Sequence, residues 1–341
     1  MSDKIKCVVW DLDETIWDGI LTEDKNVTLK KGITDIIKEL DRRGILQSIA
    51  SKNNEDDAIE KLKELGIYDY FLYPQINWNP KSASIKIIRE KLNLGINTFA
   101  FVDDREFERA EVGHGLPEVL TIDAADYEKI LDMECMKPEF ITEDTINRRK
   151  MYISDMQRKQ EEAEFTGTSH EFLNTLGMKL KIEKVTEADL QRAYELTVRT
   201  HQLNSTGYTY SYEELLKYIN SDEHIFLIAS LQDRFGDYGK IGLALVENTD
   251  VMRIKLLLMS CRVMSRGVGS AFLIHLIHLA ERFNKKLYAD FLETDRNRVM
   301  YITYKLMGFE EEENRDGKIL LKYDSDDEKE FPEYFDVTTD M

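Results

Sequence analysis

Cysteine and long apolar runs are scarce in this chain of 341 residues, and positive charges are outnumbered by negative ones. The three cysteines form no CxxC pair, which argues against a disulfide framework and a zinc site and makes the cytoplasm the expected compartment. The 46 lysines and arginines stand against 65 acids, and the net charge of −19 argues against nucleic acid as a partner, because phosphate binding needs a basic surface. No apolar stretch approaches the roughly 20 residues that span a membrane, so we expect no membrane segment. Residues 1–4 lead straight into a predicted strand, so we expect no signal peptide.

Length and composition predict a globular protein with two cores. With 42% apolar and 10% aromatic residues, the chain has room for two domains of ordinary size. We expect a first domain over residues 1–132, a helical connector over 133–176, a second domain over 177–323 and an acidic tail over 324–341. Between residues 324 and 340 the tail has eight acids and one lysine, which favours a solvated or loosely docked segment.

The most informative segment is an apolar run that is followed at once by two carboxylates. Residues 5–10 predict a central parallel strand, buried on both faces, and Asp11 and Asp13 stand where that strand ends. Open α/β sheets bind their ligands at the carboxyl ends of such strands. One carboxylate can attack a phosphorus centre and bind a cation while the other transfers protons, so the pattern predicts phosphoryl transfer.

Strand and helix patterns alternate downstream of this motif. In the first domain we expect a helix over residues 33–43 and further strands over 45–50, 71–73, 98–102 and 119–122. In the second domain we expect strands over 180–182, 225–231, 240–247, 253–260 and 287–291, and helices over 269–283 and 299–306. The alternation predicts an α/β protein whose first domain has a Rossmann-like parallel sheet with right-handed crossovers.

Further polar residues of the first domain fall at strand ends or helix starts. Ser51 follows the second predicted strand and can cap the next helix or bind an anion. Lys81 opens a helix after Pro80 and can neutralise a phosphoryl oxygen, while Asp103 and Asp104 offer the hard oxygens that Mg²⁺ prefers. No extra domain fits between Ser51 and Lys81, so we expect an open site.

In order and chemistry these residues resemble the haloacid dehalogenase (HAD) phosphotransferase superfamily, through DxDxT at 11–15, Ser51, Lys81 and the pair at 103–104. The resemblance implies that Asp11 is the nucleophile that forms an aspartyl phosphate and that Asp13 is the general acid and base. It implies that Ser51 and Lys81 hold the phosphoryl oxygens. The implied Mg²⁺ ligands are Asp11, the carbonyl of Asp13, Asp103 and Asp104.

A glycine-bearing loop before a long helix marks the second domain. Arg266, Gly267 and Gly269 belong to an R-x-x-G-x-A pattern whose backbone can approach a phosphate at the helix start. The pattern resembles the acyl-binding loop of GNAT acyltransferases, which implies an α/β domain with a mixed sheet and a pantetheine site at Arg266, Gly267 and Gly269. Cys261 lies at the end of the preceding strand and can hold an acyl group, and His201 can assist it.

The pairing of the two domains resembles the FkbH-like family of glyceryl transferase/phosphatases. The segments that carry the resemblance are 8–19 (VVWDLDETIWDG), 77–82 (NWNPKS), 101–104 (FVDD), 200–204 (THQLN), 237–242 (DYGKIG) and 260–267 (SCRVMSRG). The family implies that a three-carbon acyl phosphate of the 1,3-bisphosphoglycerate type acylates Cys261. The HAD site would remove the other phosphate, and the glyceryl group would pass to the phosphopantetheine arm of an acyl carrier protein in polyketide-type biosynthesis.

The sequence is also compatible with two other functions. In one, the first domain hydrolyses a small phosphoester and the second transfers an acyl group from acetyl-CoA in a sugar or capsule pathway. In the other, the second domain only docks a carrier protein. Carrier proteins are usually acidic, so docking on this acidic chain needs a local basic patch. The candidates for that patch are Arg262, Arg266, Arg282, Lys285 and Lys286.

Overall fold

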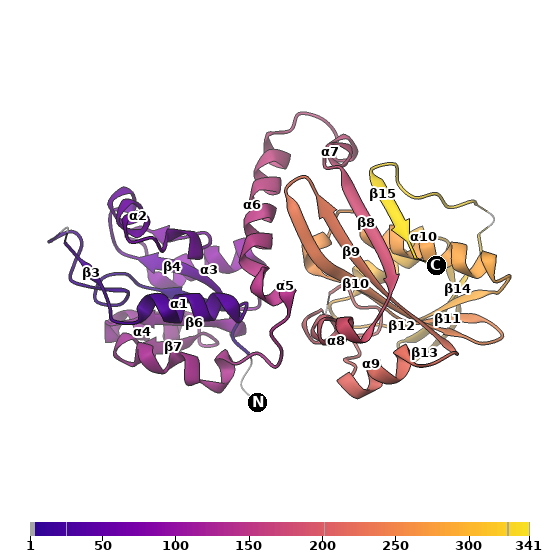
Figure 1. Ribbon diagram of the computed structural model, residues 1–341, viewed down its shortest axis with the longest axis horizontal. Coiled ribbons are helices and arrows are strands. Elements are labelled where there is room, and N and C mark those ends of the chain that lie inside the picture. The colour runs from indigo at the N-terminus through magenta and orange to yellow at the C-terminus, as the bar shows by residue number, and fades with distance from the viewer. Residues whose placement is uncertain (1–3, 25, 201, 326, 341) are drawn as a thin grey trace. The chain divides into compact units, whose positions relative to one another are not determined.

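The computed structural model describes residues 4–24, 26–200, 202–325 and 327–340. The chain forms two compact units, Met1–Ile153 and Ser154–Met341, and the division falls within helix α6 (Arg148–Glu164). Each unit contains its own sheet with helices packed against it (Figure 1). Among the described residues, none of the helices has the length and apolar character needed to cross a membrane.

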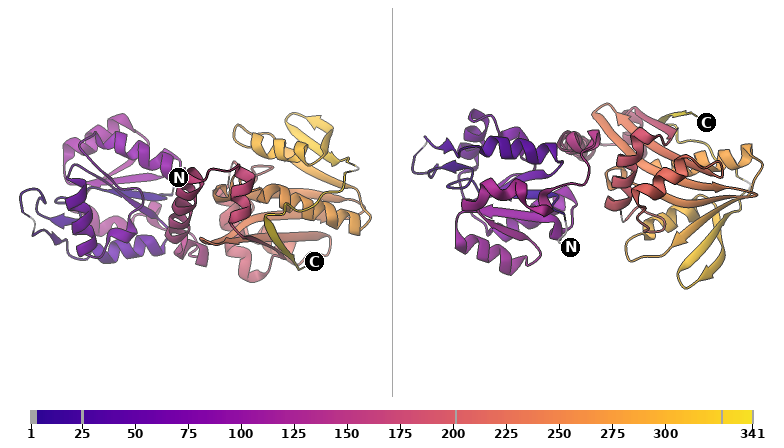
Figure 2. Two further views of the ribbon diagram at one scale, coloured as in Figure 1. Left: turned by 90° about the horizontal axis from the view of Figure 1, so that it is seen from above. Right: turned by 60° about the horizontal axis from the view of Figure 1, so that its bottom comes forward.

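Unit 1 has a five-stranded parallel sheet in the order β5-β4-β1-β6-β7, with helices on both faces (Figure 2). The strands are β1 (Cys7–Trp10), β4 (Leu46–Ser51), β5 (Gln75–Ile76), β6 (Phe99–Asp103) and β7 (Leu120–Asp123). The central strand β1 pairs with β4 and β6, and all four of its residues are buried. The parallel sheet predicted for this part of the chain is therefore confirmed.

The helices of unit 1 follow the strands in turn. They are α1 (Ile33–Arg42), α2 (Glu55–Glu64), α3 (Lys81–Leu92) and α4 (Glu106–Gly115), and the small hairpin β2 (Trp17–Asp18) and β3 (Thr28–Leu29) follows β1. Helix α1 forms because its buried apolar residues, Ile33, Ile36, Ile37 and Leu40, recur at helical spacing. These connections return the chain to the same sheet edge, which gathers the strand ends there.

One predicted strand of unit 1 is displaced. The strand expected over residues 71–73 is wrong: Phe71 makes only an isolated bridge with Gln47, and β5 begins at Gln75. Pro74 precedes the strand and has no N–H to donate, and Tyr73 has a positive φ of 50°, so the chain cannot continue as a strand through this point.

Unit 2 has an eight-stranded mixed sheet in the order β13-β14-β12-β11-β10-β9-β8-β15, which confirms the predicted α/β class and the mixed sheet. The strands are β8 (Met178–Lys184), β9 (His224–Asp233), β10 (Gly236–Asn248), β11 (Met252–Met259), β12 (Leu287–Leu292), β13 (Phe309–Arg315), β14 (Lys318–Tyr323) and β15 (Phe335–Thr339). Most pairs are antiparallel, while β11–β12 and β8–β15 are parallel.

The helices of unit 2 cover two faces of this sheet with separate cores. Helices α8 (Leu190–Arg199) and α9 (Tyr212–Ile219) pack on one face around Leu196 and Leu215, and α10 (Val268–Arg282) and α11 (Arg298–Leu306) pack with the larger core around Phe272 and Tyr304. The chain between the two sheets contains α5 (Glu143–Ile146), α6 and α7 (Ser169–Thr175).

The end of the chain includes a paired strand, where we expect a solvated or loosely docked segment from the sequence. Residues Phe335–Thr339 form β15, which pairs in parallel with β8 and completes the sheet edge. Phe335 is buried in the main core of unit 2, and Val337 packs partly against it. The expectation followed the acids of this segment, but alternating apolar side chains suffice for an edge strand with one face on a core.

Candidate active site

Asp11 stands directly after β1, at the edge where the strands of unit 1 end. The register aligns Trp10 with Ile49 of β4 and with Val102 of β6, and the backbone N–H of Asp11 donates to the Val102 carbonyl at 2.9 Å. Asp11 is buried, with an exposed fraction of 7%. The neighbouring strand ends therefore bring Asp103 beside it.

Lys81 joins this group from the start of α3. Its side chain is 3% exposed, and its ammonium Nζ donates to a carboxylate oxygen of Asp11 and, at 2.6 Å, to the carbonyl of Ala50. The same nitrogen lies 3.3 Å from Oδ2 of Asp103. A buried ammonium is stable here because two carboxylates and a carbonyl replace its hydration.

Three carboxylates form a cluster that fits a divalent cation. Oxygens of Asp11, Asp103 and Asp104 lie within 4.8 Å of one another. Oδ2 of Asp103 is buried and accepts no hydrogen bond from the described residues. Burial, followed by the charge of Asp11, raises the pKa of Asp103 to about 6, and the same two causes raise the pKa of Asp104. Hard oxygen donors that repel one another are a suitable set for Mg²⁺.

Asp13 is held apart from this cluster by three donors. Its Oδ1 accepts from Trp17 Nε1 at 2.8 Å and from the Leu21 N–H at 3.0 Å, and its Oδ2 accepts from Asn53 Nδ2 at 3.0 Å. Burial raises its pKa, and the charge of Asp11 adds to the effect. A carboxyl group that is oriented by fixed donors and has a raised pKa is suited to proton transfer.

Ser51 is buried at the end of β4, with an exposed fraction of 3%. It does not cap the next helix as expected, because Asn54 is the N-cap of α2 and accepts from the Asp57 N–H at 3.1 Å. Among the described residues, no hydrogen-bond partner is found for the Ser51 hydroxyl, so the phosphate contact expected of it stays a prediction.

Two residues of this site were missed from the sequence. Asn53 orients Asp13, and the hydroxyl of Thr15 accepts from the Asp104 N–H at 3.2 Å. Both follow strand ends, Asn53 two residues after Ser51 and Thr15 at the end of the 11–15 motif, but a lone amide or hydroxyl there has many structural uses. The arrangement of unit 1 can bind a divalent cation, hold a phosphoryl group and move a proton.

In unit 2, Cys261 begins a short 3₁₀ turn, Cys261–Val263, directly after β11. The side chain is partly exposed, and its Sγ lies 3.8 Å from Oε1 of Gln202. His201, which we expected to assist this thiol, lies outside the described residues. The thiol is therefore reachable from solvent at the end of a buried strand.

Strand β11 separates from β12 toward its end, and another segment of the same chain pairs with the edge that this leaves. Strands β11 and β12 pair only over Met252–Ile254 and Leu287–Ala289, and residues 203–205 lie between them farther along. Four contacts hold this segment: Met259 N–H to the Leu203 carbonyl at 2.9 Å, a bridge between Asn204 and Leu258, Ser205 N–H to the Leu257 carbonyl at 2.9 Å, and Leu292 N–H to the Ser205 carbonyl at 3.0 Å. Residues 203–205 therefore occupy the free backbone groups at this edge of β11.

The predicted acyl-binding loop turns into α10. Gly267 is the N-cap of α10 with a positive φ of 75°, and a Cβ on Gly269 would lie 2.8 Å from Cε of Met259. Arg266 is 5% exposed, and its guanidinium pairs with Glu162 at 3.0 Å. The guanidinium of Arg266 is thus already paired with a carboxylate of the protein. Binding of a ligand by the backbone N–H groups of this loop stays a prediction.

No family model matches the chain, and no curated protein matches it. Among solved structures, the chain is similar to the N-terminal part of BF1531 from Bacteroides fragilis, which contains a phosphatase domain complexed with Mg: 32% identity over 38% of this chain and 40% of that one, TM-score 0.35. It is also similar to the ribosomal-protein-S18-alanine N-acetyltransferase from Escherichia coli, with 17% identity over 45% and 99% of the two chains and TM-score 0.34. A third is the PaiA N-acetyltransferase from Thermoplasma acidophilum in complex with coenzyme A, with 16% identity over 43% and 99% and TM-score 0.36. The match thus spans less than half of the BF1531 chain.

Proposed function

We propose that unit 1 is a Mg²⁺-dependent phosphatase with Asp11 as its nucleophile. The observation that carries the proposal is the buried contact of Lys81 with Asp11 and Asp103, beside a cluster of three carboxylates. An attacking carboxylate is repelled by a phosphate dianion unless positive charge screens it, and this site has a lysine and a set of cation ligands for that purpose.

The proposed reaction has two steps. Asp11 attacks phosphorus and forms an aspartyl phosphate while the bond to the leaving oxygen breaks, and protonated Asp13 gives its proton to that oxygen. Asp13 then takes a proton from water, whose oxygen attacks the aspartyl phosphate and releases inorganic phosphate and the free Asp11 carboxylate. Asn53 and Trp17 keep Asp13 oriented through both steps. Mg²⁺, held by Asp11, Asp103, Asp104 and the Asp13 carbonyl, would supply positive charge to the phosphoryl oxygens.

For unit 2 we propose acyl transfer through Cys261. The substrate is a three-carbon acyl phosphate of the 1,3-bisphosphoglycerate type: the thiolate attacks the acyl carbon, phosphate leaves, and the glyceryl group forms a thioester. It then passes to the phosphopantetheine thiol of an acyl carrier protein, so that one thioester replaces another. The partly exposed thiol at the end of β11 supports this route.

One experiment tests the reactions proposed for both units. The protein is incubated with the acyl phosphate, with and without Mg²⁺, and phosphate release and the mass of the Cys261 peptide are measured. We expect Mg²⁺-dependent release and a hydroxylamine-labile glyceryl or phosphoglyceryl adduct on Cys261. The variant Asp11→Asn should lose hydrolysis and keep the adduct. Full hydrolysis by Asp11→Asn would refute the nucleophile, and an adduct at another residue would refute the role of Cys261.

A further inference from the structure

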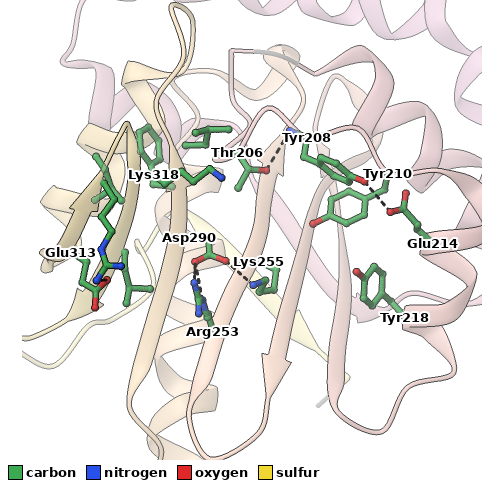
Figure 3. A pocket seen from close by; sticks show the side chains of 15 residues that line it. Thr206, Tyr208, Tyr210, Glu214, Tyr218, Arg253, Lys255, Asp290, Glu313 and Lys318 are labelled. Atoms are coloured by element: carbon green, nitrogen blue, oxygen red, sulfur yellow. Dashed lines mark hydrogen bonds and ion pairs between the residues drawn. The ribbon is translucent and has the colours of Figure 1, made fainter.

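A cavity of about 680 Å³ lies on the sheet face of unit 2 that carries α8 and α9. Its walls come from strands β11, β12, β13 and β14 on one side, and from α9 and the loop before it on the other (Figure 3). Its size is within the range of small-molecule sites. None of the residues assigned above to the active site or to acyl transfer lines it.

One wall is built from three tyrosines. Tyr208 and Tyr210 meet edge to face with ring centroids 4.6 Å apart, and Tyr210 and Tyr218 do so at 5.9 Å. The hydroxyl of Tyr208 donates to Glu214 at 2.9 Å. The hydroxyls of Tyr210 and Tyr218 point toward the opposite wall, and within the described ranges of the chain neither has a hydrogen-bond partner (Figure 3). Burial raises the pKa of both, so both stay available as donors.

The opposite wall has more positive than negative charge. Asp290 is shared by two cations, because Arg253 Nη2 lies 2.6 Å and Lys255 Nζ 2.9 Å from its oxygens. At the rim, Arg315 pairs with Glu313 at 3.2 Å. Lys318 completes the rim, and no acidic partner is found for its ammonium in the part of the chain that the structure describes. In a chain of net charge −19, this local surplus favours an anionic ligand.

We infer that this cavity binds a phosphorylated polyol, a small molecule with several hydroxyl groups and one phosphate. The phosphate lies at Lys318 and Arg315, where the positive charge is exposed and can exchange its water for phosphate oxygens. The hydroxyl groups lie between the Tyr210 and Tyr218 hydroxyls and the carboxylate of Asp290, and the carbon skeleton lies on the ring of Tyr208.

Other ligand chemistries fit the walls less well. A purely apolar ligand would leave the hydroxyls of Tyr210 and Tyr218 unpaired and desolvated, which costs free energy for each group. A cationic ligand would meet Arg253, Lys255 and Lys318. The inference does not depend on the reactions proposed for Asp11 and Cys261, because none of the residues involved is shared.

The test is calorimetric titration of the full-length protein without divalent cation. Binding at unit 1 is told apart from binding at the cavity by the substitutions described below, which all lie in unit 2. The titrants are glycerol 3-phosphate and glucose 6-phosphate, with glycerol and glucose as unphosphorylated counterparts. Binding of either phosphorylated compound supports the inference, and the preference between them identifies the three-carbon or the six-carbon source.

Two substitutions assign the binding to the cavity. Lys318→Glu should weaken it about tenfold through charge reversal, and Tyr218→Phe about fivefold through the loss of one hydrogen bond. Lys179→Glu makes the same charge change on β8, outside the cavity, and should leave affinity unchanged. The inference is overturned if neither phosphorylated compound binds, if the unphosphorylated counterparts bind as tightly, or if Lys318→Glu and Lys179→Glu behave alike.

Discussion

Arg158 of α6 and Asp233 at the end of β9 form an ion pair inside unit 2, with side chains 1% and 0% exposed. The guanidinium donates through two nitrogens, from Nε to Oδ2 at 2.5 Å and from Nη2 to Oδ1 at 2.9 Å. Tyr238 adds its hydroxyl at 2.9 Å, and its ring lies 3.8 Å from the guanidinium carbon. Both oxygens of the Asp233 carboxylate thus accept hydrogen bonds from protein groups.

Removing the cation from this pair should destabilise unit 2. Arg158→Met leaves the Asp233 charge buried and unpaired, and we expect a loss of about 3–5 kcal/mol in the free energy of unfolding. Urea unfolding followed by circular dichroism measures it. The neighbouring pair of Arg234 with Glu161 is a matched control, because both side chains are more than 40% exposed. Arg234→Met should cost less than about 1 kcal/mol, and equal losses for the two variants would contradict the prediction.

Lys81→Ala should reduce phosphatase activity about 100-fold or more, because it removes the charge that screens the attacking carboxylate. Steady-state hydrolysis of a phosphate monoester at saturating Mg²⁺ measures the loss. Lys86→Ala, on the exposed side of the same helix, is the control and should keep wild-type activity. Since Lys81 is buried, circular dichroism must show that the variant is folded; a folded variant with unchanged kcat and KM would remove Lys81 from the site.

Cys261→Ala should stop loading of the carrier protein while Mg²⁺-dependent phosphate release from a monoester continues. The two activities separate because Cys261 and Asp11 belong to different units. Mass spectrometry of the carrier protein detects the glyceryl group on its arm. Cys135→Ala is the control, because this cysteine packs against the core of unit 1. Loading by Cys261→Ala at the wild-type rate would favour a docking role for unit 2.

His275 should make the stability of unit 2 depend on pH. It is 4% exposed in α10, its Nε2 is buried without a hydrogen bond from the described residues, and burial, with a smaller effect of His278, lowers its pKa to about 4. The unfolded chain binds a proton near pH 6.5 and the folded chain near pH 4, so stability is complete above pH 6.5 and declines as pH falls toward 4.

The full change in the free energy of unfolding that His275 causes corresponds to about 3 kcal/mol. Urea unfolding at several pH values measures it, and His275→Leu is the comparison, since other acidic groups titrate in the same range. The difference between wild type and His275→Leu should shift by this amount between pH 7 and pH 4. Parallel pH profiles for the two proteins would show that His275 stays neutral in both states or is protonated in both.

The parts of the molecule that could be predicted share a strong local signal. Strand β1 is a continuous apolar run, and the carboxylates after it had to lie at the sheet edge where the other strands end. The position of Lys81 at a helix start could be predicted from Pro80 and from the helix pattern that follows it. In each case the side chain that matters stands next to the element that positions it.

What the sequence did not reveal depends on partners far along the chain. Residues 203–205 contain nothing that indicates a third strand between β11 and β12, because their bonds go to backbone groups near residues 257–259 and 292. The hairpin β13–β14 was missed because most of its first strand is acidic and exposed. Tertiary pairing overrides local propensity at such sheet edges.

The order of the sheet in unit 1 also sets when its active site can exist. Asp11, Lys81 and Asp103 are separated by 70 and by a further 22 positions, yet they meet because β6 inserts beside β1. During synthesis Asp11, the proposed nucleophile, emerges early and lacks Asp103 until β6 has paired. A nascent chain that ends before residue 99 therefore lacks the site, however much of the sheet it has formed. Binding of the proposed Mg²⁺ would therefore report that β6 has paired with β1, and it would stabilise that pairing.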